Sequence, residues 1–248
     1  MYTPEQRDRL RSELLQHAAA DPRITGAAIT GSAAAGREDR WSDIDLAFGV
    51  GSAADLPAVL SDWTDVMYGR NGALHHLDIR AGAWVYRVFL LPGTLQVDLA
   101  FVPASEFRPL ASTFRLVLGN ANEPVEAPPA RAEDLAGWGW LYALHARSCL
   151  ARGRRWQAEY MISGIRDSAL ALACIRHGLP HVHARGADEL PPESAARFEP
   201  ALARGVDAAE LSRAFTAAAH VLIAEIRATD AALAGRLEGA LKELAAAG

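Results

Sequence analysis

The sequence predicts an α+β fold, with a mixed-sheet N-terminal domain over residues 1–122 and an all-α helical-bundle domain over residues 123–248. Three observations predict it. Short apolar runs with the alternation of strands lie in the first half of the chain. A stretch rich in proline, alanine and acidic residues, from Gly119 to Asp134, then has the composition of a linker. The segments beyond it repeat their apolar residues at helical spacing.

The N-terminal half predicts alternating helices and strands. Thr3, Pro4 and Gln6 have the pattern of a helix N-terminus with a capping box, so a helix is expected from there to about Ala19. Asp55 is expected to cap a second helix. The remaining predicted elements are strands over 23–30, 43–50 and 74–82, the second helix over 56–69, and a hairpin over 83–103 that turns at 92–94.

The C-terminal half predicts helices only. Two long helices are expected over 134–153 and 155–178, each closed by a glycine, and a shorter one over 192–204. Two more alanine- and leucine-rich helices should follow from residue 207 to the C-terminus. Trp138, Trp140 and Trp156 are interpreted as packing residues of this helical domain.

Composition excludes some functions and favours others. The formal net charge of −5 argues against a nucleic-acid partner, because binding to a phosphate backbone requires a basic face. Lys242 is the only lysine, so any cation that binds phosphate here must be an arginine or a metal ion.

The sequence also indicates the cellular compartment. The charged N-terminus lacks the apolar run of a signal peptide, and no stretch is long and apolar enough to span a membrane. Cys149 and Cys174 match no metal-ligand spacing and are interpreted as core thiols in a reducing compartment. We therefore expect a cytoplasmic protein with no membrane partner; a homodimer stays open.

Paired acids are the strongest chemical signal. Asp43 and Asp45 are two residues apart on a predicted strand, so their side chains project from the same face. Two such carboxylates repel each other, and a hard divalent cation is the usual compensation. Mg²⁺ is the expected ion. Because Mg²⁺ takes few protein carboxylates and completes its shell with water and substrate phosphates, the pair also predicts a phosphorylated substrate.

Two further features complete this predicted site. Upstream of the pair, Gly31 allows the backbone to approach a phosphate closely, and Ser32 offers a hydroxyl and an amide donor. Downstream, Asp98 lies between two apolar residues in a predicted strand, where an acid is costly unless it binds a ligand or a hydrogen-bond donor. The sequence therefore predicts a metal site of Asp43, Asp45 and Asp98 beside a nucleotide-binding Gly31–Ser32 loop.

The spacing of these residues resembles a known superfamily. Gly31-Ser32, then ten residues, then Asp43-Ile44-Asp45, then a third acid at Asp98 on a hairpin strand is similar to the nucleotidyltransferases that include DNA polymerase beta. The layout with a helical second domain resembles the antibiotic-modifying branch, the lincosamide and aminoglycoside nucleotidyltransferases. The motif spans about the first 100 residues, and the helical half is similar in layout only.

The resemblance implies an activity and cofactors. It implies ATP or another nucleoside triphosphate as donor, two Mg²⁺ ions, and transfer of the nucleoside monophosphate to a hydroxyl with release of pyrophosphate. In the antibiotic-modifying relatives the third acid often takes the proton of the acceptor hydroxyl, a role that would fall to Asp98 here. The acceptor implied is a small hydroxylated molecule, such as an aminoglycoside or lincosamide antibiotic.

One predicted helix adds candidate substrate contacts. Glu159, Ser163 and Arg166 share one face of the helix over 155–178, which is either a plain solvated face or the lining of a cleft. In the second interpretation Arg166 binds the nucleotide and Glu159 contacts the acceptor, where Glu159 is also a rival general base to Asp98.

Two alternative functions remain at this stage. A protein-modifying nucleotidyltransferase of antitoxin type has the same acids, but its minimal members usually lack a long helical domain. A non-catalytic nucleotide-binding module has no need of three clustered acids.

Overall fold

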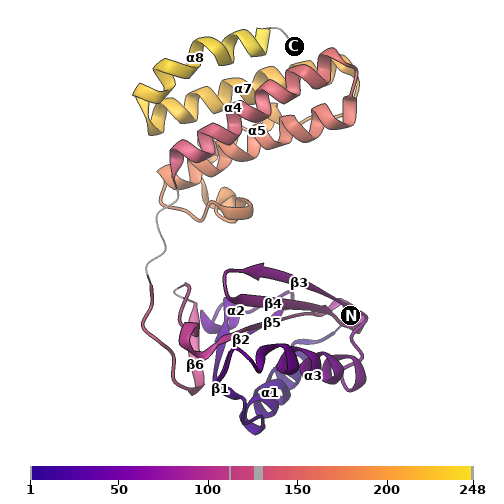
Figure 1. The fold of residues 1–248 in the computed structure, drawn as a ribbon. Helices are drawn as coiled ribbons and strands as arrows, with labels where there is room; N and C mark the ends of the chain where they lie inside the picture. The colour runs from indigo at the N-terminus through magenta and orange to yellow at the C-terminus, as the bar shows by residue number, and fades with distance from the viewer. Residues whose placement is uncertain (1, 112, 126–130, 247–248) are drawn as a thin grey trace. The chain divides into compact units, whose positions relative to one another are not determined.

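The computed structural model describes residues 2–111, 113–125 and 131–246. The chain forms two compact units, Met1–Ala127 and Pro128–Gly248. Each unit has its own hydrophobic core. The predicted α+β class, with a mixed sheet followed by helices, is confirmed (Figure 1).

The first unit is built on a mixed six-stranded sheet. Within the described residues the strand order is β3-β4-β5-β2-β1-β6, and β2 and β5 are the parallel neighbours. The strands are β1 Ile24–Thr30, β2 Ile44–Val50, β3 His75–Ala81, β4 Trp84–Leu90, β5 Gln96–Pro103 and β6 Phe114–Gly119. The last of these was not predicted. It is an edge strand whose residues are largely exposed, so it lacks the apolar alternation that reveals a half-buried strand.

The helices of the first unit are α1 Pro4–Ala20, the short α2 Gly31–Ala34 and α3 Leu56–Gly69. The predicted capping box is present: Thr3 accepts from the Gln6 amide at 3.3 Å, and Gln6 accepts from the Thr3 amide at 2.8 Å. The predicted cap at Asp55 is wrong in detail. Asp55 precedes α3, but its backbone is already helical and its side chain makes no capping hydrogen bond.

The alternation of side chains along the central strands gives the sheet two different faces. Ile44, Leu46 and Phe48 of β2 pack in one core with residues of α1 and α3, such as Leu14 and Trp63. Figure 1 shows α1 and α3 against this face of the sheet. Residues that alternate with these point to the other face, where the sheet carries small side chains. An acidic residue that points to this second face therefore lies outside the main core.

The second unit is a helical bundle. Its main helices are α4 Ala132–Ala151, α5 Arg155–Arg176, α7 Ala208–Thr229 and α8 Ala231–Ala246. The predicted helix over 192–204 is wrong, because this segment forms only α6 Pro192–Ala195 and a 3₁₀ turn, Glu199–Ala201. Pro200 accounts for the break, since it has no N–H to continue the α-helical hydrogen bonding and is tolerated only near the start of the short turn. No helix in the described ranges combines the length and apolarity needed to cross a bilayer.

The tryptophans of the helical unit differ from expectation. Trp138 is 55% exposed and Trp156 is 76% exposed, and Trp140 is also exposed. Their interpretation as packing residues is therefore wrong. Alanines and other small residues fill much of the interior instead, including Ala143, Ala146, Ala158, Ala169, Ala214 and Ala218.

Candidate active site

The sheet brings two of the predicted acids together. Because β2 and β5 are parallel neighbours, Asp45 and Asp98 are direct partners in the register. Neighbouring strands are about 4.8 Å apart, so the two side chains leave the same face side by side. Asp43 immediately precedes β2 and is two residues from Asp45, which places it in the same alternation.

Gly31 lies directly against this pair of strands. It has a left-handed backbone, with φ of 62°, and a Cβ at this position would lie 2.0 Å from Oδ2 of Asp45. Any larger residue would therefore collide with the carboxylate as well as strain the backbone. The Gly31 backbone and the Asp45 carboxylate are therefore neighbours in the structure.

Asp98 is the most perturbed acid of the site. Its Oδ1 atom is buried and has no hydrogen-bond partner within the described protein. Burial, followed by the negative charge of Asp43, raises the pKa of Asp98 to about 6. A buried carboxylate oxygen without a partner is costly, and bound cations and substrate hydroxyls are the groups that would satisfy it.

Ser32 has a similar unsatisfied atom. Its hydroxyl oxygen is buried and makes no hydrogen bond within the described residues. Ser32 follows Gly31 in α2, so this hydroxyl belongs to the same corner of the sheet as Asp45. A serine hydroxyl can donate one hydrogen bond and accept others, so this capacity is unused within the described residues.

These residues fit a divalent cation, although they do not enclose one. All the donors are oxygens, which hard cations prefer, and the Asp98 carboxylate has an orphaned oxygen. Among the described residues, however, no three acidic, histidine or cysteine side chains are grouped as a complete metal site. Such an open arrangement suits Mg²⁺, which takes one or two protein carboxylates and fills its shell with water and phosphate oxygens.

A buried arginine that was not predicted from the sequence holds the segment that precedes Asp43. Arg7 of α1 is only 4% exposed and donates to the backbone oxygen of Asp39 at 2.6 Å. Its guanidinium also lies 3.3 Å from Glu38, which pairs with Arg11 as well. The helix therefore anchors the segment that leads into β2. An arginine in a charged helical stretch gives no sign of burial in the sequence.

A small cavity, also missed from sequence, lies beside the acids. Its volume is about 140 Å³, and Ala47 and Ala100, two residues beyond Asp45 and Asp98, line it. The rings of Trp84 and Tyr86 stack at 5.9 Å and form part of its wall. The space suits a flat ring next to the carboxylates.

The predicted residues of the helical unit have partners within that unit. Glu159 accepts a hydrogen bond from Ser163 at 2.7 Å. Arg166 pairs with its neighbour Asp167 at 2.7 Å. The structure therefore brings Gly31, Asp45 and Asp98 together, whereas Glu159 and Arg166 belong to a separate unit.

Comparison with solved structures finds similar chains, among them an aminoglycoside 6-adenyltransferase from Bacillus subtilis, which is 13% identical over 93% of this chain and 95% of its own, with a TM-score of 0.37. No protein-family model and no curated protein matches the chain.

Proposed function

We propose that this chain is a Mg²⁺-dependent nucleotidyltransferase that moves a nucleoside monophosphate, AMP from ATP, to a hydroxyl of a small acceptor and releases pyrophosphate. The observation that carries the proposal is the in-register pair of Asp45 and Asp98, with the Gly31 backbone held against the Asp45 carboxylate. A partly buried pair of like charges is unfavourable in a purely structural role. Clustered, perturbed carboxylates are characteristic of active sites.

Each residue of the site has a role in the proposal. Asp43, Asp45 and Asp98 are the metal ligands, and the bound Mg²⁺ supplies positive charge for the phosphate oxygens of an in-line displacement. Gly31 gives the triphosphate room to approach the backbone, and Ser32 donates its hydroxyl, which has no partner in the described protein, to a phosphate oxygen.

Asp98 is proposed as the general base as well. The acceptor hydroxyl passes its proton to the Asp98 carboxylate while its oxygen forms a bond to the α-phosphorus. The bond from the α-phosphorus to the bridging oxygen breaks, and pyrophosphate leaves. Without metal the pKa of Asp98 is about 6, and a Mg²⁺ ion at the carboxylate would lower it, so the group would be ionised at neutral pH as a base must be.

Two residues of the helical unit complete the proposal. Arg166 is proposed to contact the nucleotide and Glu159 the acceptor. For this, Arg166 must exchange its present partner, Asp167, for a phosphate oxygen. An aminoglycoside or lincosamide is the proposed class of acceptor, in line with the sequence resemblance, and the protein is proposed to act without nucleic acid.

A pyrophosphate-release screen tests this function. Each nucleoside triphosphate is offered with Mg²⁺ against a panel of aminoglycosides, lincosamides and other hydroxylated metabolites. We expect release that requires both Mg²⁺ and an acceptor, and that falls at least about a hundredfold in Asp45→Asn, because a metal ligand is lost.

Gly31→Ala and Gly36→Ala form a matched pair for the same assay. Both glycines have a left-handed backbone, with φ of 62° and 65°, but a Cβ at Gly36 meets no atom within 4 Å. Both substitutions should therefore cost about 1 kcal/mol of stability, whereas only Gly31→Ala displaces the Asp45 carboxylate. Full activity in Gly31→Ala, or in Asp45→Asn, would contradict the proposed site.

A further inference from the structure

Strand β3 is an open edge of the sheet. It is the outermost strand at one side of the sheet (Figure 1), and within the described residues it pairs with β4 alone. Its seven residues, His75–Ala81, pair with β4 without a register shift and include neither proline nor lysine. Bulges, prolines and lysines commonly protect edge strands, whose unpaired backbone groups can otherwise pair with another chain. β3 lacks all three, whereas the ladder at the other edge, between β1 and β6, contains a register shift.

The hairpin turn determines which backbone groups of β3 point outward. Gly82 and Ala83 form a two-residue turn between β3 and β4, and Gly82 has φ of 58°. Such a turn is closed by a pair that exchanges both backbone hydrogen bonds, here Ala81 and Trp84, and every second pair along the hairpin does the same. The amides and carbonyls of the residues in between therefore point away from β4. These residues are His76, Asp78 and Arg80.

Large apolar side chains are exposed along the same edge. Leu77 is 61% exposed and Ile79 is 51% exposed, and Leu74, which directly precedes the strand, is 62% exposed. In the register of the sheet, Leu77 is the partner of Val88, which is the partner of Asp98. Leu77 and Ile79 therefore lie on the face that carries the acids, opposite the face that packs on α3. A single exposed leucine is ordinary, but several at one open edge indicate a contact surface.

The charges of β3 are complementary to those of a second copy in one register. If two copies of β3 pair antiparallel with Ile79 opposite Ile79, then Asp78 of each copy lies directly opposite Arg80 of the other. Both residues have outward backbone groups, so these pairs also exchange backbone hydrogen bonds. Arg80 is exposed, and its distance of 3.9 Å from Asp78 of its own chain is long for an ion pair. A register centred on Asp78 would instead place two aspartates opposite each other, which is unfavourable.

The other charged and titratable side chains on this face of the hairpin are compatible with the pairing. Arg87 of β4 binds Asp78 at 2.7 Å and also donates to Thr64 of α3 at 2.6 Å, so it holds the Asp78 carboxylate in place. The His76 ring is 3.0 Å from the hydroxyl of Tyr68. In the register centred on Ile79, His76 lies opposite Gly82 of the other copy, which has no side chain to oppose it.

We propose that this chain forms a homodimer in which the β3 strands of two copies pair antiparallel about Ile79. Asp78 of each copy then pairs with Arg80 of the other on the face that carries α3, and the two Ile79 side chains meet on the opposite face. The two-fold axis is perpendicular to the sheet, so the two sheets become one, with the acids of both copies on the same side. One strand pair is a small interface, and the dimer should be reversible. The inference is independent of the proposed function.

Sedimentation equilibrium of the full chain tests the association. We expect a monomer–dimer equilibrium at protein concentrations up to about 100 µM. Arg80→Glu places like charges opposite each other at two symmetric positions, so it should weaken the dimer at least about tenfold. Arg9→Glu, at an exposed position of α1, makes the same change in net charge and is the matched control. It should associate like the wild type.

Cysteine cross-linking tests the register. Opposite Ile79 residues form a non-hydrogen-bonded pair with Cα atoms about 4.5 Å apart, which is short enough for a disulfide. Leu77 lies opposite Ala81 of the other copy, so the two Leu77 residues are about 13 Å apart along the strands. Mild oxidation should therefore link Ile79→Cys into a covalent dimer and leave Leu77→Cys, the matched control, unlinked. The native Cys149 and Cys174 are buried, so the wild type should not cross-link either.

The outcomes separate the dimer from its register. A wild-type chain that stays monomeric over this concentration range would overturn the homodimer. Failure of Ile79→Cys to cross-link would overturn the strand pairing whatever the oligomeric state, and so would a dimer that Arg80→Glu does not weaken. Cross-linking of Leu77→Cys as readily as Ile79→Cys would overturn the register. Thermal melts of the variants establish that each is folded.

Discussion

Asp98 determines how the metal-free protein responds to pH. Its pKa is about 6 in the folded chain and 3.8 in the ordinary, solvated state. Between these two values the folded protein binds more protons than the unfolded one. The contribution of Asp98 to the free energy of unfolding therefore decreases as pH rises from about 4 to about 6, and this loss is complete above that window.

Asp98→Asn should remove this loss. We expect the variant to be more stable than the wild type at pH 7.5 by on the order of 2 kcal/mol, with the difference shrinking toward pH 5. Urea unfolding in the presence of EDTA, from pH 5 to pH 8, measures it. Asp65→Asn, at an exposed position on α3, is the control and should show no such trend. A difference that is constant with pH would show that Asp98 is not strained in the folded protein.

The same residues show what sequence can reveal about a site. Asp43, Asp45 and Asp98 were predicted as a site because acids in apolar strands are costly unless a ligand or a hydrogen-bond donor satisfies them. The register that pairs Asp45 with Asp98 depends on a parallel contact between β2 and β5, which no local pattern specifies. Arg7 gave no signal at all, because its burial is a tertiary effect.

At the level of elements, helix α1 supports the active-site segment. Arg7 and Arg11 reach from this helix to Glu38 and to the backbone of Asp39, just before β2. Arg7→Met keeps much of the side-chain volume and removes the charge and the donors. We expect it to cost about 1.5–3 kcal/mol of stability, since it removes a buried charged donor from the Asp39 carbonyl and one of the two arginine partners of Glu38.

The effect of Arg7→Met should be localised. Hydrogen exchange should become faster over residues 38–43, and nucleotidyl transfer should slow, because Asp43 loses its fixed position. Arg9→Met, at an exposed position of the same helix, is the matched control and should change neither measurement. Normal exchange over residues 38–43 in Arg7→Met would show that α1 does not brace this segment.

Elements were predicted well where periodicity and caps agree. Helix α1, with its capping box, and strand β2, with its apolar residues around Asp45, are examples. The edge strand β6 and the broken segment around Pro200 were missed for opposite reasons. β6 has too little burial to show a pattern, while the segment before Pro200 has helix-forming residues that one proline overrides.

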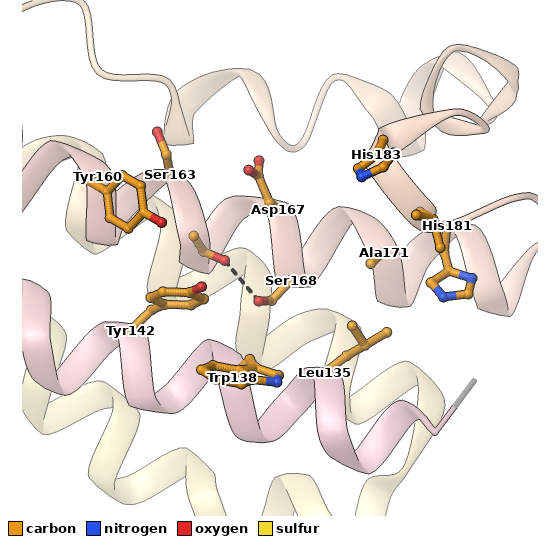
Figure 2. A pocket seen from close by; sticks show the side chains of 12 residues that line it. Leu135, Trp138, Tyr142, Tyr160, Ser163, Asp167, Ser168, Ala171, His181 and His183 are labelled. Atoms are coloured by element: carbon orange, nitrogen blue, oxygen red, sulfur yellow. Dashed lines mark hydrogen bonds between the residues drawn. The ribbon is translucent and has the colours of Figure 1, made fainter. Parts of the chain in front are cut away.

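Over the whole molecule, two separate cores carry separate features. The carboxylates and the Gly31–Ser32 corner belong to the sheet unit, whereas a cavity of about 480 Å³, lined in part by Trp138, Tyr142 and Asp167, belongs to the helical unit (Figure 2). Sequence predicted the division into a sheet half and a helical half because the hydrophobic period changes along the chain. The cavity was missed, since Trp138 in its wall was interpreted as a packing residue of the helical domain.

The last prediction concerns the site of the sheet unit. ATP with Mg²⁺ should raise the melting temperature more than either component alone, because a ligand at 100 times its Kd adds about 2.7 kcal/mol to folded-state stability. Hydrogen exchange should show new protection over residues 30–46 and 96–99 with Mg²⁺ and ATP. Asp45→Asn should abolish this protection, whereas Asp65→Asn, at an exposed position on α3, should leave it unchanged. Protection by ATP that is equal with and without Mg²⁺ would place the nucleotide away from the carboxylates and contradict their role as metal ligands.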